Sequence, residues 1–392
     1  MSAKKLLAII NGEIHTAQNK EPLRGTILVQ DGKIAAIGDV NLPPEADVID
    51  AAGAAIYPGF IDPHTHLGVS EQGLGWEGRD YNEMTDPVTA HLRALDAINP
   101  EEDGYREAVE AGITTVMCAP GSANILGGST VVLKPGGGLL HQRVLRANAG
   151  IKAALGENPK RVYSGAKKAP STRMASAAIL REALVAAQNY QNKLERAGGD
   201  ADKLPPRDLK AEALLPVLKK EVPLRMHAHR ADDIATALRI AKEFEINLTL
   251  EHASEAHFLL DKVAQSGFPA IVGPSLGTPG KVETQKKTLD TVKILSEAGV
   301  TVALTTDHPV LNIYQLLHAA AAVVRETGMD EYDVLRLITI NAAQILGVDQ
   351  RVGSIEVGKD ADLVIIEGHP FDYLSRVLYT IIDGQVIYPQ QA

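Results

Sequence analysis

Short apolar runs alternate with amphipathic stretches through the middle of the chain. The runs Ile113–Met117, Ile246–Leu250 and Val300–Leu304 are rich in β-branched residues and predict buried strands. Residues 232–244 repeat apolar positions at helical spacing and predict a helix between two such strands. This alternation over roughly 300 residues favours a parallel sheet with helical crossovers, and a closed (β/α)8 TIM-type barrel needs about 250. A doubly wound open sheet is the alternative, although the chain has no phosphate-cradling Gly-Lys-Ser/Thr sequence.

Both ends of the chain differ from the middle because they predict hairpins. Asp31-Gly32 separates two apolar runs near the start, and Asp383-Gly384 separates two near the end. Residues 361–366 predict a further buried strand. We therefore expect residues 1–55 and 353–392 to pair into one small β-sandwich domain, with residues 56–352 inserted between them as the central domain.

Three segments depart from the simple alternation. Residues 171–197 predict a long amphipathic helix, and residues 276–287 form a polar loop. Each segment either caps an active site or is a surface insertion. The Gly- and Ser-rich stretch 121–130 predicts a flexible loop after a strand.

Composition narrows the partners that the chain can have. Hydrophobic residues make up 45% and charged residues 22%, and the net charge is −10, which argues against nucleic acid or an anionic membrane as a partner. No stretch approaches the roughly 20 apolar residues of a membrane helix, and the apolar run near the start is too short for a secretory signal. The one cysteine, Cys118, fits a reducing compartment. We expect a cytoplasmic protein with a small-molecule substrate, and homo-oligomerisation stays open.

The strongest chemical signal is the pair His64 and His66 at the end of an apolar run. Side chains at i and i+2 of a strand point to the same face, so two imidazoles so spaced can bind one cation. Comparable polar residues end three further predicted strands, namely the pair His227 and His229, then His252, and then Asp307. Imidazole and carboxylate are the ligands of zinc and similar cations, and strand ends of a barrel meet on one face.

At this point the chain resembles the amidohydrolase superfamily along essentially its whole length. The resemblance is carried by Pro58–His66, by the stretch 353–363 with its Gly-Lys-Asp-Ala-Asp-Leu end, and by Asp307 at the position of the last barrel strand. Among its branches, the chain is similar to imidazolonepropionase-like and dipeptidase-like proteins. The resemblance implies a barrel that holds one or two divalent cations, most often zinc.

Carried over residue by residue, the resemblance implies a set of metal ligands. His64 and His66 are ligands of the first cation, and Asp307 is both a ligand and the general base. His252 and one histidine of the His227/His229 pair complete the set. We prefer His229, which leaves His227 behind the ligands or in contact with substrate.

The ligand that decides between one cation and two is a glutamate or a carbamylated lysine in relatives. Glu157 and Lys152 are the two candidates here, and we prefer Glu157 because it follows the predicted strand. Three further residues are candidate substrate contacts, namely His308, Arg161 and Tyr163.

These residues predict hydrolysis of a carbon–nitrogen bond in an amide, cyclic amide, N-acyl compound or dipeptide. A metal-activated hydroxide attacks, and Asp307 transfers the proton. This chemistry requires no serine or cysteine nucleophile. The alternative within enzymes is a deaminase that acts on an amidine carbon of a heterocycle. The alternative from another class is a non-catalytic scaffold, which the intact ligand set disfavours.

Overall fold

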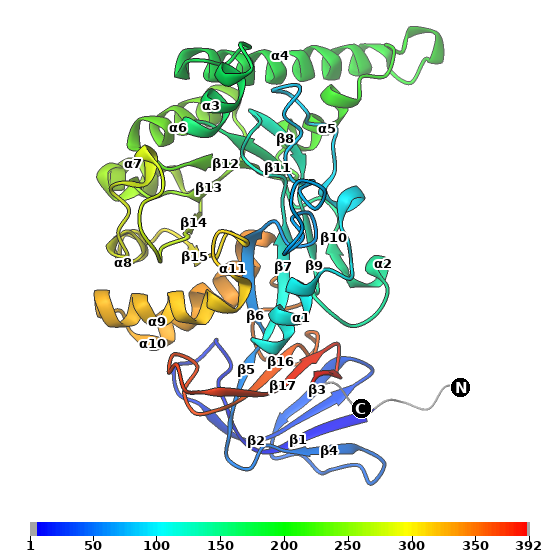
Figure 1. Cartoon of the computed structure of the whole chain (residues 1–392). Coiled ribbons are helices and arrows are strands. Elements are labelled where there is room, and N and C mark those ends of the chain that lie inside the picture. Colours follow the sequence, from blue (N-terminus) through cyan, green and yellow to red (C-terminus); the bar gives the residue numbers. More distant parts are fainter. Residues whose placement is uncertain (1–5, 390–392) are drawn as a thin grey trace.

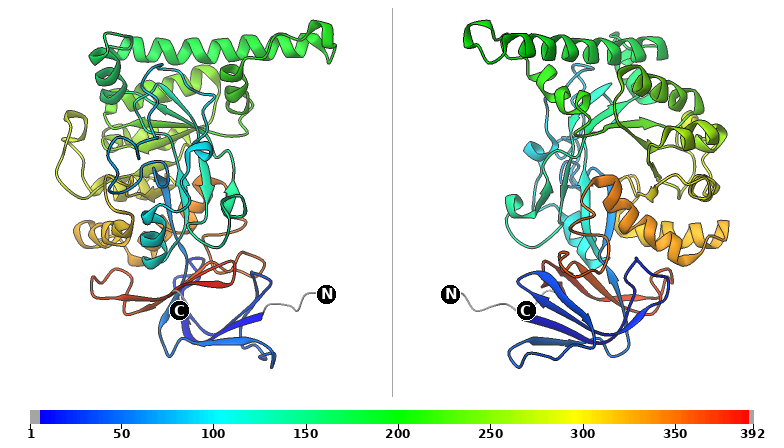
Figure 2. Two further views of the ribbon diagram at one scale, coloured as in Figure 1. Left: turned by 45° about the vertical axis from the view of Figure 1, so that its right-hand side comes forward. Right: turned by 180° about the vertical axis from the view of Figure 1, so that it is seen from behind.

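The computed structural model describes residues 6–389, which form a β-sheet built from both chain ends and a larger α/β region above it (Figure 1). Two further views place this sheet at one end of the molecule and the long helix α4 at the opposite end (Figure 2). Within residues 6–389, no helix has the length and apolarity needed to cross a bilayer.

The end sheet has eight strands in the order β18-β17-β16-β5-β1-β2-β3, with β4 paired to β1. β16 lies between β17 and β5, so a strand from the end of the chain sits inside a sheet begun at its start. The strands are β1 (Leu6–Ile14), β2 (Leu23–Gln30), β3 (Lys33–Gly38), β4 (Asp47–Asp50), β5 (Ala55–Pro58), β16 (Leu363–Glu367), β17 (Arg376–Ile382) and β18 (Gln385–Tyr388). The pairing of both chain ends is thus observed, whereas the division into two domains at residues 55 and 353 stays a prediction.

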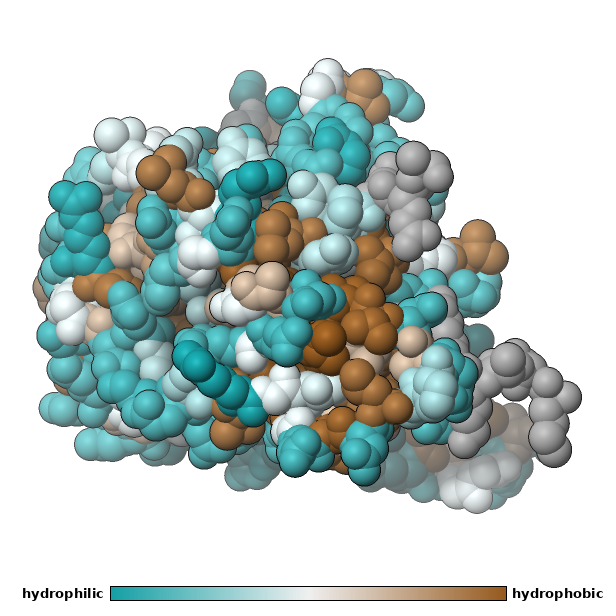
Figure 3. Space-filling model, turned by 90° about the horizontal axis from the view of Figure 1, so that it is seen from below, coloured by the Kyte–Doolittle hydropathy of each residue, from teal (hydrophilic) through white to brown (hydrophobic). Residues whose placement is uncertain are grey.

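Both predicted hairpins are present in this sheet. Asp31-Gly32 joins β2 to β3, and Asp383-Gly384 joins β17 to β18. All four residues have positive φ, between 49° and 79°, as a type I′ turn requires. Beneath the turns, the strands bury a separate apolar core that includes Ile56. Seen from below, hydrophobic side chains gather near the centre of the exposed face within a hydrophilic border (Figure 3).

The α/β region contains two further sheets. The first has the order β10-β9-β7-β6 and the second has the order β15-β14-β13-β12-β11-β8. Their strands are β6 (Phe60–Thr65), β7 (Ile113–Cys118), β8 (Leu126–Ser129), β9 (Val131–Leu133), β10 (Val144–Arg146), β11 (Ile151–Ala154), β12 (Leu224–Ala228), β13 (Leu248–His252), β14 (Ala270–Val272) and β15 (Val302–Leu304). β6 pairs with β7 in parallel, and β11 to β15 are parallel to one another.

The expectation of a purely parallel sheet is wrong at β8 and β9. β8 runs antiparallel to β11, and β9 runs antiparallel to β7, with only Thr130 between β8 and β9. The prediction of a flexible loop over residues 121–130 is therefore wrong for its second half. Glycine is needed here for a different reason: at Gly128, with φ of 124°, a Cβ would lie 2.4 Å from the carbonyl oxygen of Leu92.

Helices cover the strands of the α/β region. They are α1 (Asp103–Glu110), α2 (Leu140–Arg143), α3 (Glu157–Gly165), α4 (Arg173–Ala197), α5 (Leu209–Leu218), α6 (Ala231–Phe244), α7 (Leu260–Ser266), α8 (Asp290–Glu297), α9 (Leu316–Thr327), α10 (Glu331–Leu337) and α11 (Ile340–Leu346). The 3-10 turns are η1 (Ala94–Ala97), η2 (Ala201–Lys203), η3 (Ala256–Leu259), η4 (Val282–Thr284) and η5 (Ile313–Gln315).

The long predicted helix is present as α4. Thr172 caps its start by accepting a hydrogen bond from the Ala175 N–H, and Gly198 ends it in the left-handed conformation. Its buried face includes Leu180 and Leu184, and the helix packs on α5 at the outer edge of the molecule (Figure 1).

Candidate metal centre

Three residues from two strands form a first group of ligand atoms. His64 lies in β6, His66 directly follows that strand, and Asp307 follows β15. Asp307 Oδ1 lies 3.5 Å from His64 Nε2 and 3.4 Å from His66 Nε2. The predicted His-x-His pair therefore turns both side chains toward one carboxylate.

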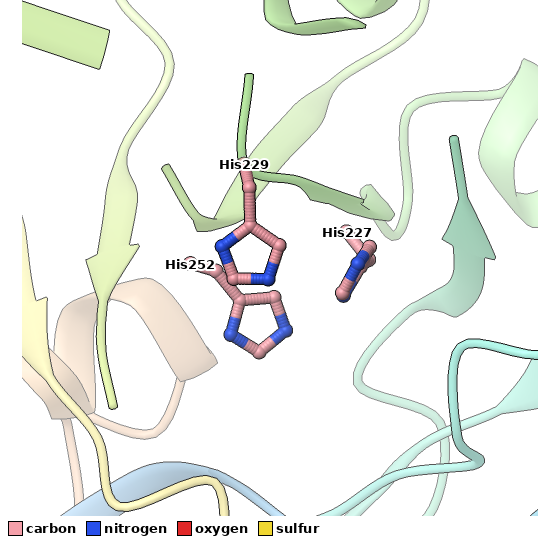
Figure 4. A group of neighbouring side chains, drawn as sticks. All are labelled: His227, His229 and His252. Atoms are coloured by element: carbon pink, nitrogen blue, oxygen red, sulfur yellow. The ribbon is translucent and has the colours of Figure 1, made fainter. Parts of the chain in front are cut away.

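Three imidazoles form a second group (Figure 4). His227 and His252 belong to β12 and β13, and His229 comes directly after β12. The rings of His229 and His252 are stacked with centroids 4.9 Å apart, and the His227 ring stands nearly perpendicular to that of His229. Asp307 Oδ2 lies 3.9 Å from His252 Nδ1 and connects the two groups. Both histidines of the His-x-His pair on β12 belong to this group, so the choice between them stays a prediction.

Two of these residues have unusual backbone conformations. His252 has a φ of 73° and Asp307 a φ of 53°, values that non-glycine residues rarely adopt. Such conformations cost free energy and persist where the surrounding structure enforces them, most often at functional sites.

The Nδ1 atoms of four imidazoles are held by partners outside the two groups. This arrangement turns each Nε2 toward the centre, where that of His64 contacts Lys152 Nζ, as in histidines that bind metal through that atom. The contacts are His64 to Glu251 Oε2 at 2.6 Å, His66 to the Ala119 carbonyl at 2.8 Å, His229 to Ser254 Oγ at 2.8 Å and His252 to the Gly273 carbonyl at 2.7 Å.

Glu251 is itself fixed by a buried arginine. Arg225 of β12 donates from Nη1 to Glu251 Oε1 at 3.1 Å, and both side chains have no exposed surface. The same guanidinium donates to the carbonyl oxygens of Ala149 and Ile345. Arg225, Glu251 and His64 therefore form a rigid chain of contacts that orients the first histidine of the site.

The two candidates for the bridging ligand lie in different places. Lys152 of β11 is buried with its Nζ 2.9 Å from His64 Nε2, and burial lowers its pKa to about 8. Glu157 begins α3 and contacts Glu283 instead: each backbone N–H donates to a carboxylate oxygen of the other residue. Glu157 belongs to neither ligand group. The physical reason is the turn at Gly156, with φ of 90°, which starts α3 before Glu157 can extend the strand.

The three candidate substrate contacts differ in their surroundings. His308 is buried and accepts a hydrogen bond at Nδ1 from the Ile313 N–H, while its Nε2 has no partner among residues 6–389. Arg161 is exposed and lines a cavity of about 490 Å³ that also reaches Glu283. Tyr163 is buried and donates its hydroxyl to the Asp86 carbonyl at 2.8 Å. Their roles toward substrate stay predictions.

The two groups fit a divalent cation. Within residues 6–389, Asp307 Oδ1 and both ring nitrogens of His227 are buried without a hydrogen-bond partner. Buried polar atoms normally have partners, so these atoms point to a ligand outside the chain. Burial lowers the pKa of His227 and His252 well below its ordinary value, and that of His229 to about 3. All three imidazoles are therefore neutral at pH 7, which is the form that binds metal.

Three residues around this site were not among the predicted ones. Glu251 directly precedes His252, but a strand places neighbouring side chains on opposite faces, so the sequence favoured only one of them. Arg225 lies two residues before His227 and therefore shares its face of the strand, so this spacing could have identified Arg225 from the sequence. Glu283 lies in the polar loop 276–287, whose contacts depend on the fold.

Comparisons with known proteins agree with this site. The model of the amidohydrolase family matches residues 210–387. The crystal structure of an amidohydrolase from Thermotoga maritima MSB8 is 42% identical, with a TM-score of 0.95, and the match covers 98% of this chain and 100% of that one.

Two curated proteins extend the comparison. Amidohydrolase tasK of Hapsidospora irregularis is 29% identical over 92% of this chain, which spans 39% of that protein's length. An imidazolonepropionase of Symbiobacterium thermophilum is 29% identical over 87% of this chain and 83% of its own length.

The fold and the site thus define an α/β hydrolytic enzyme whose buried imidazoles and carboxylate suit a metal ion. The chain belongs to the amidohydrolase superfamily. It is a hydrolase that acts on carbon–nitrogen bonds.

Proposed function

We propose that this protein is a metal-dependent amidohydrolase that cleaves an amide-like carbon–nitrogen bond, with Asp307 as its general base. The observation that carries the proposal is the position of the Asp307 carboxylate. This carboxylate faces the imidazoles of both groups, and its Oδ1 has no partner within residues 6–389. The substrate class is an amide, a cyclic amide or an N-acyl or dipeptide compound.

The fold that supports this chemistry is proposed to be a closed barrel of the TIM type, with β8 and β9 in the place of its third strand. These two short strands connect the two sheets, because β9 pairs with β7 and β8 pairs with β11. At the other seam, the His66 N–H donates to the His308 carbonyl. Asp62 of β6 accepts hydrogen bonds from the hydroxyls of Thr305 and Thr306, which follow β15.

We propose which residues hold the cations. His64, His66 and Asp307 hold one, and His252 with a histidine of the His227/His229 pair holds the other. The donors are imidazole nitrogens and carboxylate oxygens, so zinc is the proposed metal. A bound divalent cation lowers the pKa of water and polarises the carbonyl group that is attacked.

The bridging role is proposed for Lys152 in place of Glu157. Lys152 lies against His64, and its lowered pKa of about 8 gives it more neutral amine at pH 7 than an exposed lysine has. The neutral amine forms a bond from Nζ to the carbon of CO₂ and loses a proton to solvent. The product is a carbamate, whose two oxygens turn the lysine into an anionic ligand.

Asp307 performs the proton transfer in this proposal. Its ionised carboxylate takes a proton from the attacking water and passes it to the leaving nitrogen, which departs as an amine. The strained backbone at Asp307 holds the carboxylate in place before substrate binds, so little reorganisation accompanies the step.

The test is a substrate panel run on the metal-loaded protein. It contains cyclic amides, N-acyl amino acids and dipeptides, each followed by release of the new amine or carboxylate. Amidine heterocycles, followed by release of ammonia, form a separate arm. Hydrolysis of an amide bond that stops on chelation and returns with Zn²⁺ is the expected result. Ammonia release alone would instead assign a deaminase, and purified protein without a stoichiometric cation after reconstitution would overturn the proposal.

A further inference from the structure

The loop between β14 and α8 places one carboxylate beside the second imidazole group. This loop contains η4, in which Glu283 has 1% of its surface exposed, whereas the preceding Val282 is 62% exposed. A polar loop that buries a glutamate among histidines and exposes a valine departs from the usual pattern of burial. The side chain of Glu283 therefore has a specific partner at this place.

The distances around Glu283 repeat those around Asp307. Glu283 Oε1 lies 3.5 Å from His227 Nε2 and 3.9 Å from His229 Nε2. Asp307 Oδ1 lies 3.5 Å and 3.4 Å from the corresponding atoms of His64 and His66. In both places one carboxylate oxygen faces two imidazole nitrogens that come from a His-x-His pair.

These separations fit ligands of one cation better than hydrogen bonds. An N–H···O hydrogen bond is about 2.7–3.2 Å long, and neither ring nitrogen of His227 has a partner in the described part of the chain. Nitrogen and oxygen ligands about 2.0–2.2 Å from a tetrahedral zinc ion lie roughly 3.3–3.6 Å from one another. The 3.5 Å contact of Glu283 with His227 falls in that range, and the 3.9 Å contact lies slightly beyond it.

The loop is held by Glu157, and Oε1 of Glu283 accepts a long hydrogen bond from Lys281 Nζ. Oε2 accepts a hydrogen bond from the Glu157 N–H at 2.8 Å, and the Glu283 N–H donates in turn to Glu157 Oε2 at 3.3 Å. Lys281 Nζ lies 3.4 Å from Oε1 on the remaining side. Glu157 thus fixes the loop, and Oε1 is directed toward the imidazoles.

We propose that Glu283 is a carboxylate ligand of the cation held by the second imidazole group, supplied by the β14–α8 loop. The proposal rests on the function proposed above and extends its site. His227, His229 and His252 offer only neutral nitrogens to a cation, whereas the first group contains Asp307. A carboxylate from the loop gives the second group a negative charge of its own, and it makes occupancy of that group depend on the conformation of residues 273–289.

The experiment measures the number of bound cations and their affinity in three proteins that are stripped of metal and reconstituted with Zn²⁺. They are the full-length chain, Glu283→Gln and the matched control Glu157→Gln. Glu157→Gln changes the carboxylate that is hydrogen-bonded to Glu283 in the same loop. The new side chain keeps an oxygen that accepts the Glu283 N–H, and residue 157 contacts no imidazole. Zinc content is measured by elemental analysis, affinity by competition with a chelator, and coordination by the visible absorption of the Co²⁺-loaded proteins.

We expect two cations per chain in the unmodified protein and in Glu157→Gln. Residues that only orient a metal ligand contribute about 10–100-fold to cation affinity. Because Glu283→Gln removes a direct ligand, the affinity for one of the two cations should fall by at least about 100-fold. Its Co²⁺ absorption should change as well. Circular dichroism of the metal-free variant checks that it folds.

Three outcomes decide against the proposal in distinguishable ways. If Glu283→Gln binds two cations with unchanged affinity and absorption, Glu283 is not a ligand and the proposed hydrolase function stands. If Glu157→Gln loses the ion and Glu283→Gln keeps it, Glu157 is the ligand. If the unmodified chain retains no stoichiometric cation, the proposed function fails first and the role of Glu283 falls with it.

Discussion

Two clusters of buried charge lie in different parts of this molecule, and they differ in how completely they are paired. In the first, Lys134 directly follows β9 and is almost fully buried. Its ammonium donates to Asp360, Asp362 and Asp383 at 2.9, 2.8 and 2.7 Å. In the second, the ligand groups at the ends of β6, β12, β13 and β15 leave Asp307 Oδ1 and both nitrogens of His227 without partners among residues 6–389.

The difference separates a structural role from a binding role. A buried ion costs several kcal/mol unless partners compensate it. Around Lys134 the chain supplies the partners, and the three carboxylates come from segments next to the strands of the end sheet. One oxygen, Asp362 Oδ2, stays unpaired there, and burial raises the pKa of this carboxyl to about 6. At the ligand groups the compensating charge is missing from the chain, as expected for a site that binds a cation.

The largest effect is expected from Asp307→Asn. Loss of the general base should lower kcat/KM by about 10²–10⁴-fold on whichever substrate of the panel is hydrolysed best. The free energy of unfolding of the metal-free protein should change little, because Asp307 Oδ1 has no partner to lose. Urea denaturation beside the kinetics checks both parts. A variant that is strongly destabilised without metal would remove the contrast between the clusters.

Lys134→Met tests how much the paired cluster contributes to stability. Removing the ammonium leaves the buried Asp362 carboxylate without a cationic partner, whereas Asp360 keeps Lys33 and Arg351. We therefore expect a loss of about 3–5 kcal/mol in the free energy of unfolding, measured by urea denaturation. Cation content per folded chain should equal that of the unmodified protein, since no ligand group contacts Lys134. Loss of the cations from the folded fraction would show that the two clusters are coupled.

Glu251→Gln tests a residue that is paired and also serves the site. It removes the charge that lies between Arg225 and His64, and so it frees the His64 ring to turn. Cation affinity should fall by about 10–100-fold, as measured by chelator competition. An unchanged affinity, with Arg225 still buried, would mean that neighbouring packing alone orients His64.

The smallest effect is expected from Lys20→Met. Lys20 lies 2.6 Å from Asp330, a contact as short as those of Lys134, but 62% and 41% of the two side chains are exposed. Water screens the charges of an exposed ion pair, so the free energy of unfolding should hardly change. A loss as large as that in Lys134→Met would show that contact distance, and not burial, governs these clusters.

Much of the site was predictable because its signals are local. The spacing of His64 and His66 and the position of His252 and Asp307 after apolar runs depend only on strand periodicity, and the structure brings these residues together. The choice between Lys152 and Glu157 stays a prediction, and it depends on the turn at Gly156 that directly precedes α3. Periodicity does not locate element ends that precisely.

The wrong prediction about β8 and β9 has a non-local cause. β8 and β9 contain glycines that favour a loop, and their strand conformation depends on pairing with β7 and β11. The α/β class and both hairpins were correct, because alternation and the Asp-Gly turns carry that information within short windows. The contact of Glu283 with His227 joins two distant segments, and no pattern within either segment indicates it.

The position of β16 has a consequence for biosynthesis. The first five strands of the end sheet leave the ribosome early, but the edge of β5 receives its partner only when residues 363–367 have been made. The nascent chain therefore carries an open strand edge during most of translation, and such an edge can pair with other chains. A stop codon at residue 352 would spare every proposed ligand yet make that exposure permanent, so the shortened product should aggregate rather than accumulate as an active fragment.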